Sequence, residues 1–380
     1  MGKSATGVSS QMPHSIVEPA LQSPLKFTAI WQSKDCGRDW PGRGWIMRLF
    51  EPYISEHISD GEHEVAMDNA IVFDPWVSAR DPSYYAKFRG KNAFLVHLYD
   101  EFFDLGVERY AHFRGVFRFY WSSVFNPRHV MVLPLGSFVE QVPASVLRAS
   151  DRRYAWSFIG DGGKTSRPEM VRAMSAIEPH ICFSTTPIRS IAFFDRDSAG
   201  SKRIPLHDTL EILGQSVFAP APMGNANVEC WRPYDALDVG AIPILERRLT
   251  LDYYKQLLGD HPLPTVSSWS QARRLAIGLL NDPVKLDELQ QSCMQWWRSY
   301  KIELIKRIGT FLEERSLADD ELAPLQSWLP KLPFWQDLEL LRHHSMPALG
   351  RRAVRQMKRV VYEKKWRVAI VKQGDSRLQG

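Results

Sequence analysis

The feature that most constrains the fold is a succession of short apolar runs separated by polar segments with helical character. In the first part of the chain, runs of four to six residues fit buried strands at 26–31, 70–73, 94–98, 116–121 and 130–133. Short apolar strands joined by helix-compatible segments are typical of parallel sheets covered by helices. The sequence therefore predicts an α/β fold.

A second series of the same kind begins after Arg152. Its apolar runs predict strands at 154–159, 216–219 and 241–245. A helix is expected from Arg167, with Ser166 as its N-terminal cap and Pro168 in its first turn. A further helix is expected over 231–239. Two series in a chain of 380 residues predict two consecutive α/β domains.

The remaining segments set the domain boundaries that we expect. A long amphipathic helix is predicted from Pro283 to about Arg315, capped by Asp282. The expected units are a flexible leader (1–24), a first α/β domain (25–148), a second α/β domain (149–285), C-terminal helices (286–345) and a basic tail (346–380).

The net charge of +5 is distributed unevenly along the chain. From Arg351 to the end, ten basic residues face two acidic ones, so this tail carries +8 and the rest of the chain −3. Basic and apolar residues alternate in the tail, which suits an amphipathic helix on anionic lipid or on the protein body; the alternative is a solvated end. No secretory signal is recognisable, and Cys36, Cys182, Cys230 and Cys293 lack metal-ligand spacing. We expect a cytoplasmic protein with peripheral membrane contact through 351–380.

The first constellation with chemical character follows the strand predicted at 154–159. Its glycines would let backbone N–H groups approach an anion, and its cations add charge: Gly160, Gly162, Gly163, Lys164 and Arg167. The spacing matches neither a Walker A loop nor a dinucleotide fingerprint. The loop therefore predicts a diphosphate site, with a plain glycine-rich turn as the alternative.

The second constellation follows the strand predicted at 216–219, where open α/β sheets bind ligands. It contains Asn225, Asn227, Glu229, Arg232 and Asp235. An arginine can bind a phosphate with two N–H groups, and a carboxylate can accept both hydroxyls of a ribose. The steps of three residues let the last three side chains share a face. The alternative is a capped helix with a surface Arg–Asp pair.

Residues 227–244 read N-x-E-x-W-R-x-Y-D-A-L-x-x-G-A-I-P-I. This pattern resembles the donor-binding signature of exostosin-like glycosyltransferases, and it is similar to E-T-F-R-x-x-E-A-L-x-x-G-x-I-P-V of the ribitol xylosyltransferase group. Residues 157–167 and 132–136 resemble the start of the family's nucleotide-binding domain and the end of its first domain. Segments 95–101 and 116–121 resemble its strand ends.

The resemblance implies a GT-B-like fold, with two Rossmann-like domains facing a cleft and a C-terminal helical extension. It also implies an inverting transfer of a sugar, xylose or a related one, from a UDP-linked donor to a glycan or polyol-phosphate acceptor. The second domain would hold the donor through the two constellations above. One departure is Asp235, which stands where the family has a glutamate and is one methylene shorter.

A base for the acceptor hydroxyl is expected near the end of the strand at 94–98, where Asp100 and Glu101 follow. The alternative is that both are structural. Arg118 lies in an apolar run and needs a partner, either one of these acids or a substrate phosphate. Asp195 and Asp197 have the spacing of a metal motif, but we favour a metal-independent reaction without a cofactor, in which Lys164, Arg167 and Arg232 balance the diphosphate.

Three other function classes fit less well. A glycoside hydrolase would use paired carboxylates but needs no nucleotide site. A phosphoryl-transfer enzyme would need a P-loop, which is missing. A non-catalytic protein that binds membrane or nucleic acid would depend on the basic tail. The cations outside the tail are placed for a diphosphate, so we expect a glycosyltransferase without a nucleic-acid partner.

Overall fold

The computed structural model describes ten segments of the chain: 25–32, 42–59, 68–74, 82–98, 100–101, 107–139, 142–184, 204–248, 252–318 and 323–326. The expected leader (1–24), the metal motif at Asp195 and Asp197, and the basic tail (346–380) lie outside these segments. Within them, no helix is both long enough and apolar enough to cross a membrane.

The first domain is built on a parallel sheet of six strands in the order β2-β1-β3-β4-β5-β6. Its strands are β1 Phe27–Trp31, β2 Ile54–Ser59, β3 Ala70–Asp74, β4 Ala93–His97, β5 Gly115–Arg118 and β6 Val130–Val132. Its helices are α1 Arg43–Phe50, η2 Glu51–Tyr53, α2 Pro82–Ala86 and α3 Val107–Tyr110. Every residue of β3 and β4 is buried, as a central strand covered on both faces requires.

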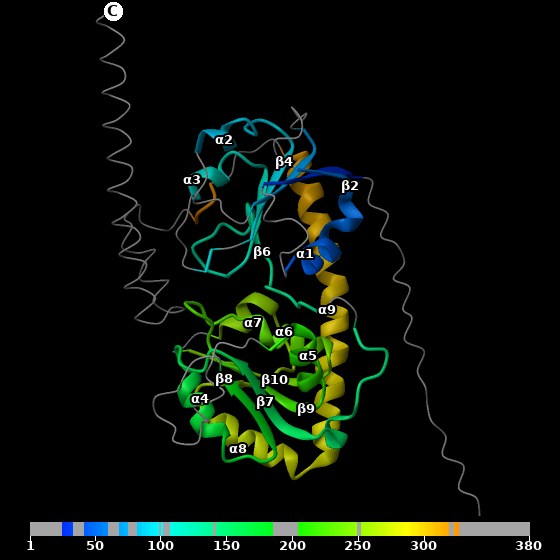
Figure 1. The fold of residues 1–380 in the computed structure, drawn as a ribbon. Coiled ribbons are helices and arrows are strands. Elements are labelled where there is room, and N and C mark those ends of the chain that lie inside the picture. Colours follow the sequence, from blue (N-terminus) through cyan, green and yellow to red (C-terminus); the bar gives the residue numbers. More distant parts are fainter. Residues whose placement is uncertain are drawn as a thin grey trace, which may run out of the picture.

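The second domain holds a parallel sheet of five strands in the order β11-β10-β9-β7-β8. Its strands are β7 Tyr154–Gly160, β8 His180–Ser184, β9 Ser216–Ala221, β10 Ile242–Glu246 and β11 Thr265–Val266. Its helices are η4 Ala149–Asp151, α4 Arg167–Met174, α5 Leu206–Gly214, α6 Arg232–Asp238, α7 Tyr253–Leu258 and α8 Trp269–Leu280. Figure 1 shows α5, α6 and α7 on the side toward the first domain and α8 on the opposite side.

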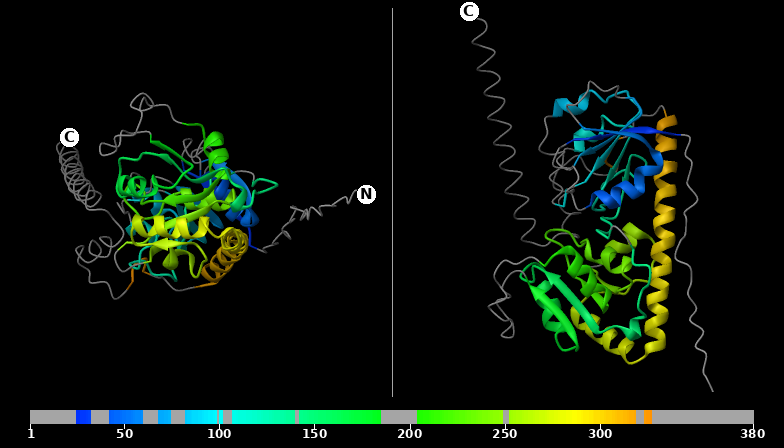
Figure 2. Two further views of the ribbon diagram at one scale, coloured as in Figure 1. Left: turned by 90° about the horizontal axis from the view of Figure 1, so that it is seen from below. Right: turned by 45° about the vertical axis from the view of Figure 1, so that its right-hand side comes forward.

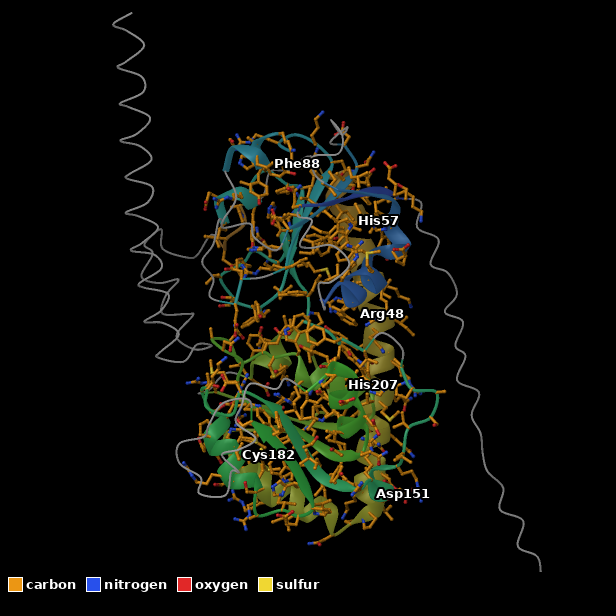
Figure 3. All side chains as sticks on the ribbon, viewed as in Figure 1. Arg48, His57, Phe88, Asp151, Cys182 and His207 are labelled. Atoms are coloured by element: carbon orange, nitrogen blue, oxygen red, sulfur yellow. The ribbon has the colours of Figure 1, made fainter. Side chains whose placement is uncertain are left out.

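Residues that follow strands of the first sheet contact residues that follow β9 of the second. Glu101, after β4, accepts a hydrogen bond from Ala226 N (2.7 Å), and Leu135 N, after β6, donates to Glu229 (2.8 Å). The carboxyl ends of the two sheets therefore face each other, which confirms the predicted GT-B-like arrangement of two Rossmann-like domains. Figure 3 shows Arg48 of α1 and His207 of α5 on the two sides of this boundary.

One long helix, α9 Pro283–Leu317, packs against both domains (Figure 2). Its 35 residues extend about 50 Å at 1.5 Å per residue. Near its start, Gln290 accepts from Ala149 N and donates to Gly240 O of the second domain. Further along, Ile305 O accepts from the hydroxyl of Tyr53 in the first domain. This helical extension and its cap, Asp282, are as the sequence predicted.

Some local expectations were wrong. Ser166 makes no capping hydrogen bond to α4, because its backbone is helical (φ −88°, ψ −1°) and its hydroxyl oxygen accepts from Met223 N (3.3 Å) instead. The strand expected over 116–121 ends at Arg118, since Tyr120 adopts a positive φ of 63° that breaks the extended backbone. By contrast, the helix expected over 231–239 is confirmed: it spans Arg232–Asp238, with Trp231 and Val239 as its cap residues.

The segment that links the domains depends on one glycine, Gly136. Its φ is +77°, and a Cβ at this position would lie 2.2 Å from ring atoms of the buried Trp45. We expect Gly136→Ala to lower the free energy of unfolding by about 2–5 kcal/mol, because positive φ and overpacking both cost energy. Denaturant unfolding monitored by circular dichroism measures this change.

The matched control is Gly278→Ala in the interior of α8. A Cβ there meets nothing within 4 Å, and alanine favours the helix over glycine, so the same substitution should stabilise by about 0.5–1 kcal/mol. Similar stabilities for the two variants would show that the backbone at Gly136 relaxes freely.

Candidate functional site

The two predicted constellations meet at the point where the strand order of the second sheet reverses. From β7 the chain continues to β8 on one side of the sheet and then returns to β9 on the other. Ligands of open α/β sheets bind at such a point, outside the carboxyl ends of the strands. Here Lys164 Nζ lies 3.1 Å from Asn225 Oδ1, and the Thr165 hydroxyl donates to Met223 O at 3.1 Å. The loops that follow β7 and β9 are therefore in contact.

Two arginines supply positive charge beside this contact. Arg167 donates to Asp161 O (2.8 Å) and Met223 O (3.3 Å), and Arg232 donates to Ile159 O (2.8 Å). All these acceptors are neutral backbone carbonyls, and within the described segments neither guanidinium forms a salt bridge. Burial, together with repulsion from Arg167, lowers the pKa of Arg232. Such an arrangement favours binding of an anion.

Both arginines line a cavity of about 250 Å³. Phe138 and Trp231 form an aromatic wall of this cavity, with stacked rings whose centroids are 4.4 Å apart. Asp235 also lines it, and the guanidinium of Arg232 lies 4.2 Å from the centroid of the Phe158 ring. The cavity thus combines two cations, a carboxylate and flat apolar surfaces.

The predicted glycines have different roles. Gly160 has a φ of +152°, and a Cβ on it would lie 3.1 Å from the guanidinium of Arg232, so the glycine allows this arginine to approach the strand. The N–H groups of Gly162 and Gly163 donate to Ser184 Oγ (2.9 Å) and Asp161 Oδ1 (3.0 Å). In this conformation the second and third glycines stabilise the loop itself.

Glu229 lies in a buried network at the boundary between the domains. Its carboxylate accepts from Leu135 N (2.8 Å), Tyr234 OH (2.6 Å) and Tyr253 OH (2.7 Å). Burial raises its pKa to about 7, although these three donors act in the opposite direction. Glu229 therefore does not line the cavity; it holds the connection between the domains.

Asp235 lines the cavity and also binds the segment that links the two domains. Its Oδ1 accepts from the Ser137 hydroxyl (3.0 Å) and from Phe138 N (2.7 Å), and burial raises its pKa to about 7. Of the three side chains that the sequence placed on a common face, Arg232 and Asp235 share the cavity, whereas Glu229 points elsewhere.

The adjacent acids Asp100 and Glu101 are separated by the fold. Asp100 is buried and forms a salt bridge with Arg118 Nη2 at 3.1 Å, which identifies the partner that the arginine needed. Glu101 instead crosses to the second domain, where it accepts from Ala226 N (2.7 Å), Asn227 N (3.2 Å) and Asn225 Nδ2 (3.4 Å). Of these two acids, Glu101 is the one that contacts the loop after β9.

Several residues of this region were not identified from the sequence. Tyr253, which binds Glu229, also accepts a hydrogen bond from Trp121 N (2.8 Å) and so joins three segments. Ser137 and Phe138 lie in the segment that links the two domains. The Ser137 hydroxyl donates to Asp235, and the Phe138 ring stacks on Trp231. No local pattern marks a tyrosine or a serine for such contacts, so only the resemblance of 132–136 to a domain end pointed to this part of the chain.

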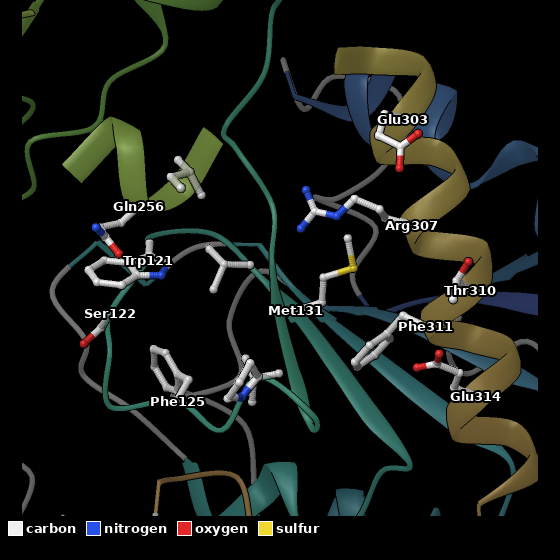
Figure 4. A pocket seen from close by; sticks show the side chains of 14 residues that line it. Trp121, Ser122, Phe125, Met131, Gln256, Glu303, Arg307, Thr310, Phe311 and Glu314 are labelled. Carbon is white, nitrogen blue, oxygen red and sulfur yellow. The ribbon is translucent and has the colours of Figure 1, made fainter. Parts of the chain in front are cut away.

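A second, larger cavity of about 550 Å³ lies among β6, α7 and α9 (Figure 4). Aromatic side chains line it, including Trp121, Phe125 and Phe311, together with the exposed Glu303 and Arg307 of α9. None of the site residues predicted from the sequence lines this cavity.

Comparison with protein-family models and with curated proteins found no match. Among solved structures, an α1,3-fucosyltransferase aligns over 80% of this chain and 94% of its own, with 12% identity and a TM-score of 0.48. A DNA-modifying β-glucosyltransferase aligns over 75% and 99%, with 11% identity and a TM-score of 0.44. An O-GlcNAc transferase mutant of Thermobaculum terrenum aligns over 80% and 69%, with 13% identity and a TM-score of 0.45. These likenesses are too distant to assign the chain to a family.

Proposed function

We propose that the protein is a glycosyltransferase that transfers a sugar from a nucleoside diphosphate donor to an acceptor hydroxyl. The observation that carries this proposal is the pair Arg167 and Arg232, which line one cavity at the switch point of the second sheet and whose hydrogen bonds within the described segments all go to backbone carbonyls. Two cations and one carboxylate, Asp235, line this cavity at the carboxyl end of a parallel sheet, and the excess of positive charge suits a ligand with several negative charges.

A diphosphate leaving group would fit these cations. A guanidinium carries five N–H donors, of which the described contacts use two in Arg167 and one in Arg232. The remaining donors can bind phosphate oxygens in the forked geometry that arginine favours. Lys164 is half-exposed and forms a salt bridge with Asp161 Oδ2 (2.9 Å), so it would exchange this partner for the phosphate to add a third charge. Positive charge fixed near the departing diphosphate stabilises the transition state of sugar transfer.

The nucleoside would occupy the rest of the cavity. Both described hydrogen bonds to Asp235 use Oδ1, so Oδ2 can accept from a ribose hydroxyl. The stacked rings of Trp231 and Phe138 provide an apolar surface for a nucleobase or the ribose. The resemblance of 227–244 to exostosin-like enzymes supports uridine as the base and xylose or a related sugar as the cargo.

The reaction needs a base at the acceptor, and we propose Glu101 for it because Asp100 is held by Arg118. The Glu101 carboxylate takes the proton of the acceptor hydroxyl, whose oxygen bonds to the anomeric carbon. The bond from that carbon to the phosphate oxygen breaks, and the nucleoside diphosphate leaves. Attack opposite the leaving group inverts the anomeric centre, and the cations of the chain supply the charge balance without a metal or a cofactor.

The acceptor and the location of the protein form part of the same proposal. We propose a glycan or polyol phosphate as acceptor, bound mainly by the first domain, in a cytoplasmic enzyme. The charge of +8 in the last thirty residues supports peripheral contact of 351–380 with anionic lipid.

Nucleotide binding tests the proposal directly. Isothermal titration calorimetry should detect UDP, with weaker binding of UMP and uridine, because the two arginines interact with phosphate charge. A screen of UDP-sugars by thermal melting should then identify the donor, since a ligand at 100 times its Kd stabilises by about 2.7 kcal/mol. Absence of binding of any nucleoside diphosphate at millimolar concentration would contradict the proposal.

A further inference from the structure

The carboxylate of Glu101, in the first domain, accepts hydrogen bonds from several N–H groups of the second domain. The loop after β9 presents Ala226 N and Asn227 N to one carboxylate oxygen, Oε1, at 2.7 and 3.2 Å. The side-chain amide of Asn225 approaches the other oxygen, Oε2, at 3.4 Å. Gly224 makes this approach easy, since a Cβ there would lie 3.0 Å from Oε1. Consecutive backbone N–H groups directed at one point form an anion-binding concavity, and here the anion is a side chain of the protein.

These donors lie beside the groups that we propose to bind the diphosphate. They belong to the loop at the carboxyl end of β9, beside the loop that carries Lys164 and Arg167. Lys164 Nζ contacts Asn225, the residue next to the two backbone donors. A carboxylate with one charge and a diphosphate with two or three would therefore compete for the same groups.

The contact of Glu101 is suited to exchange. Only neutral donors hold its carboxylate, and within the described segments it forms no salt bridge. Glu101 is half-buried and Asn225 is exposed, whereas Ala226 and Asn227 are buried, so a ligand would reach their N–H groups as Glu101 moves away. By contrast, Asp100 next to it is buried against Arg118. The fold thus fixes one of the two acids and leaves the other exchangeable.

We propose that Glu101 is a latch that closes the diphosphate subsite in the donor-free enzyme and is displaced when the donor binds. This inference rests on the proposed function. It adds that the N–H groups of Ala226 and Asn227 receive a phosphate of the donor. Displacement frees the carboxylate of Glu101 at the moment when a base is needed, so donor binding and base activation are coupled. The latch reduces the apparent donor affinity, because only the unlatched fraction of the protein binds.

Calorimetry with three probes, UDP, inorganic pyrophosphate and uridine, tests the latch. We expect Glu101→Ala to bind UDP and pyrophosphate about ten-fold more tightly than the wild type, since opening no longer breaks charge-assisted hydrogen bonds. Uridine carries no phosphate, so its affinity should not change. Glu101→Gln keeps the shape but loses the charge, and it should give a smaller gain. Both variants should lose transfer activity, because the base is missing.

The control is Glu303→Ala, which removes the same charge from an exposed site on α9 and should leave all three affinities unchanged. Unchanged or weaker binding of UDP by Glu101→Ala, in a protein whose wild type binds UDP, would overturn the latch and leave the proposed function standing. If neither protein binds UDP or pyrophosphate, the donor site itself is refuted, and the latch with it.

Discussion

Arg232→Ala is expected to reduce sugar transfer by about 10²–10³-fold, the loss typical of removing one charged or hydrogen-bonding group from a transition-state site. The guanidinium of Arg232 lies at the cavity beside Arg167, bound to Ile159 O alone among the hydrogen bonds described. Its loss removes positive charge where the leaving diphosphate develops negative charge. Affinity for UDP should fall about 10–100-fold, as calorimetry would measure.

Two further variants make this result specific. Arg232→Lys keeps the charge but loses the planar fork, so its UDP affinity should be intermediate. Arg273→Ala changes an exposed arginine of α8 and should alter neither affinity nor transfer. Circular dichroism should show the wild-type fold in all three proteins. UDP binding that is unaffected in Arg232→Ala would exclude this arginine from the donor site.

Glu229→Ala should lower the free energy of unfolding by about 3–5 kcal/mol, because it leaves three buried donors without their acceptor. These donors are Leu135 N, Tyr234 OH and Tyr253 OH, which belong to the domain connection, to α6 and to α7. Denaturant unfolding measures the loss. Glu288→Ala, at an exposed position of α9, is the matched control and should change stability by less than about 0.5 kcal/mol.

The raised pKa of Glu229 predicts how the free energy of unfolding depends on pH. Burial raises the pKa of Glu229 to about 7 in the folded protein, against about 4.3 in the unfolded chain. The folded state therefore binds the proton more tightly, and the contribution of this group to stability falls as the pH rises from about 4.3 to 7. The slope is at most about 1.4 kcal/mol per pH unit. Comparison with Glu229→Gln should isolate this slope, since Asp235 contributes in the same direction in both proteins. If the difference in the free energy of unfolding between the wild type and Glu229→Gln did not vary with pH, this prediction would be wrong.

The strands that the sequence predicted are mostly those buried on both faces. β3 and β4 are buried throughout, so nearly every residue is apolar and the run is easy to recognise. The strands that sequence reasoning missed, β2, β8 and β11, all lie at sheet edges. β2 contains exposed polar residues such as Glu56 and His57, and β11 has two residues. An edge strand needs less apolar surface, so its pattern is weak.

The candidate site, too, was predicted from the sequence only in part. The glycine loop after β7 and the Asn/Arg loop after β9 were identified from residues close together in the sequence. The hydrogen-bond partners of Glu229 and Glu101 were not identified. Leu135 lies 94 positions from Glu229 in the sequence, and Ala226 lies 125 positions from Glu101. Sequence spacing carries no information about hydrogen bonds between domains.

The sequence by itself therefore determined the two α/β domains and the kinds of residue that follow each strand, since burial and loop chemistry depend on local composition. Only the tertiary structure decided what neighbouring residues do. Asp100 and Glu101 have the same chemistry, yet one is paired with Arg118 inside the first domain and the other reaches the loop of the second. The physical reason is that consecutive side chains leave the backbone in different directions, so their partners come from different parts of the fold.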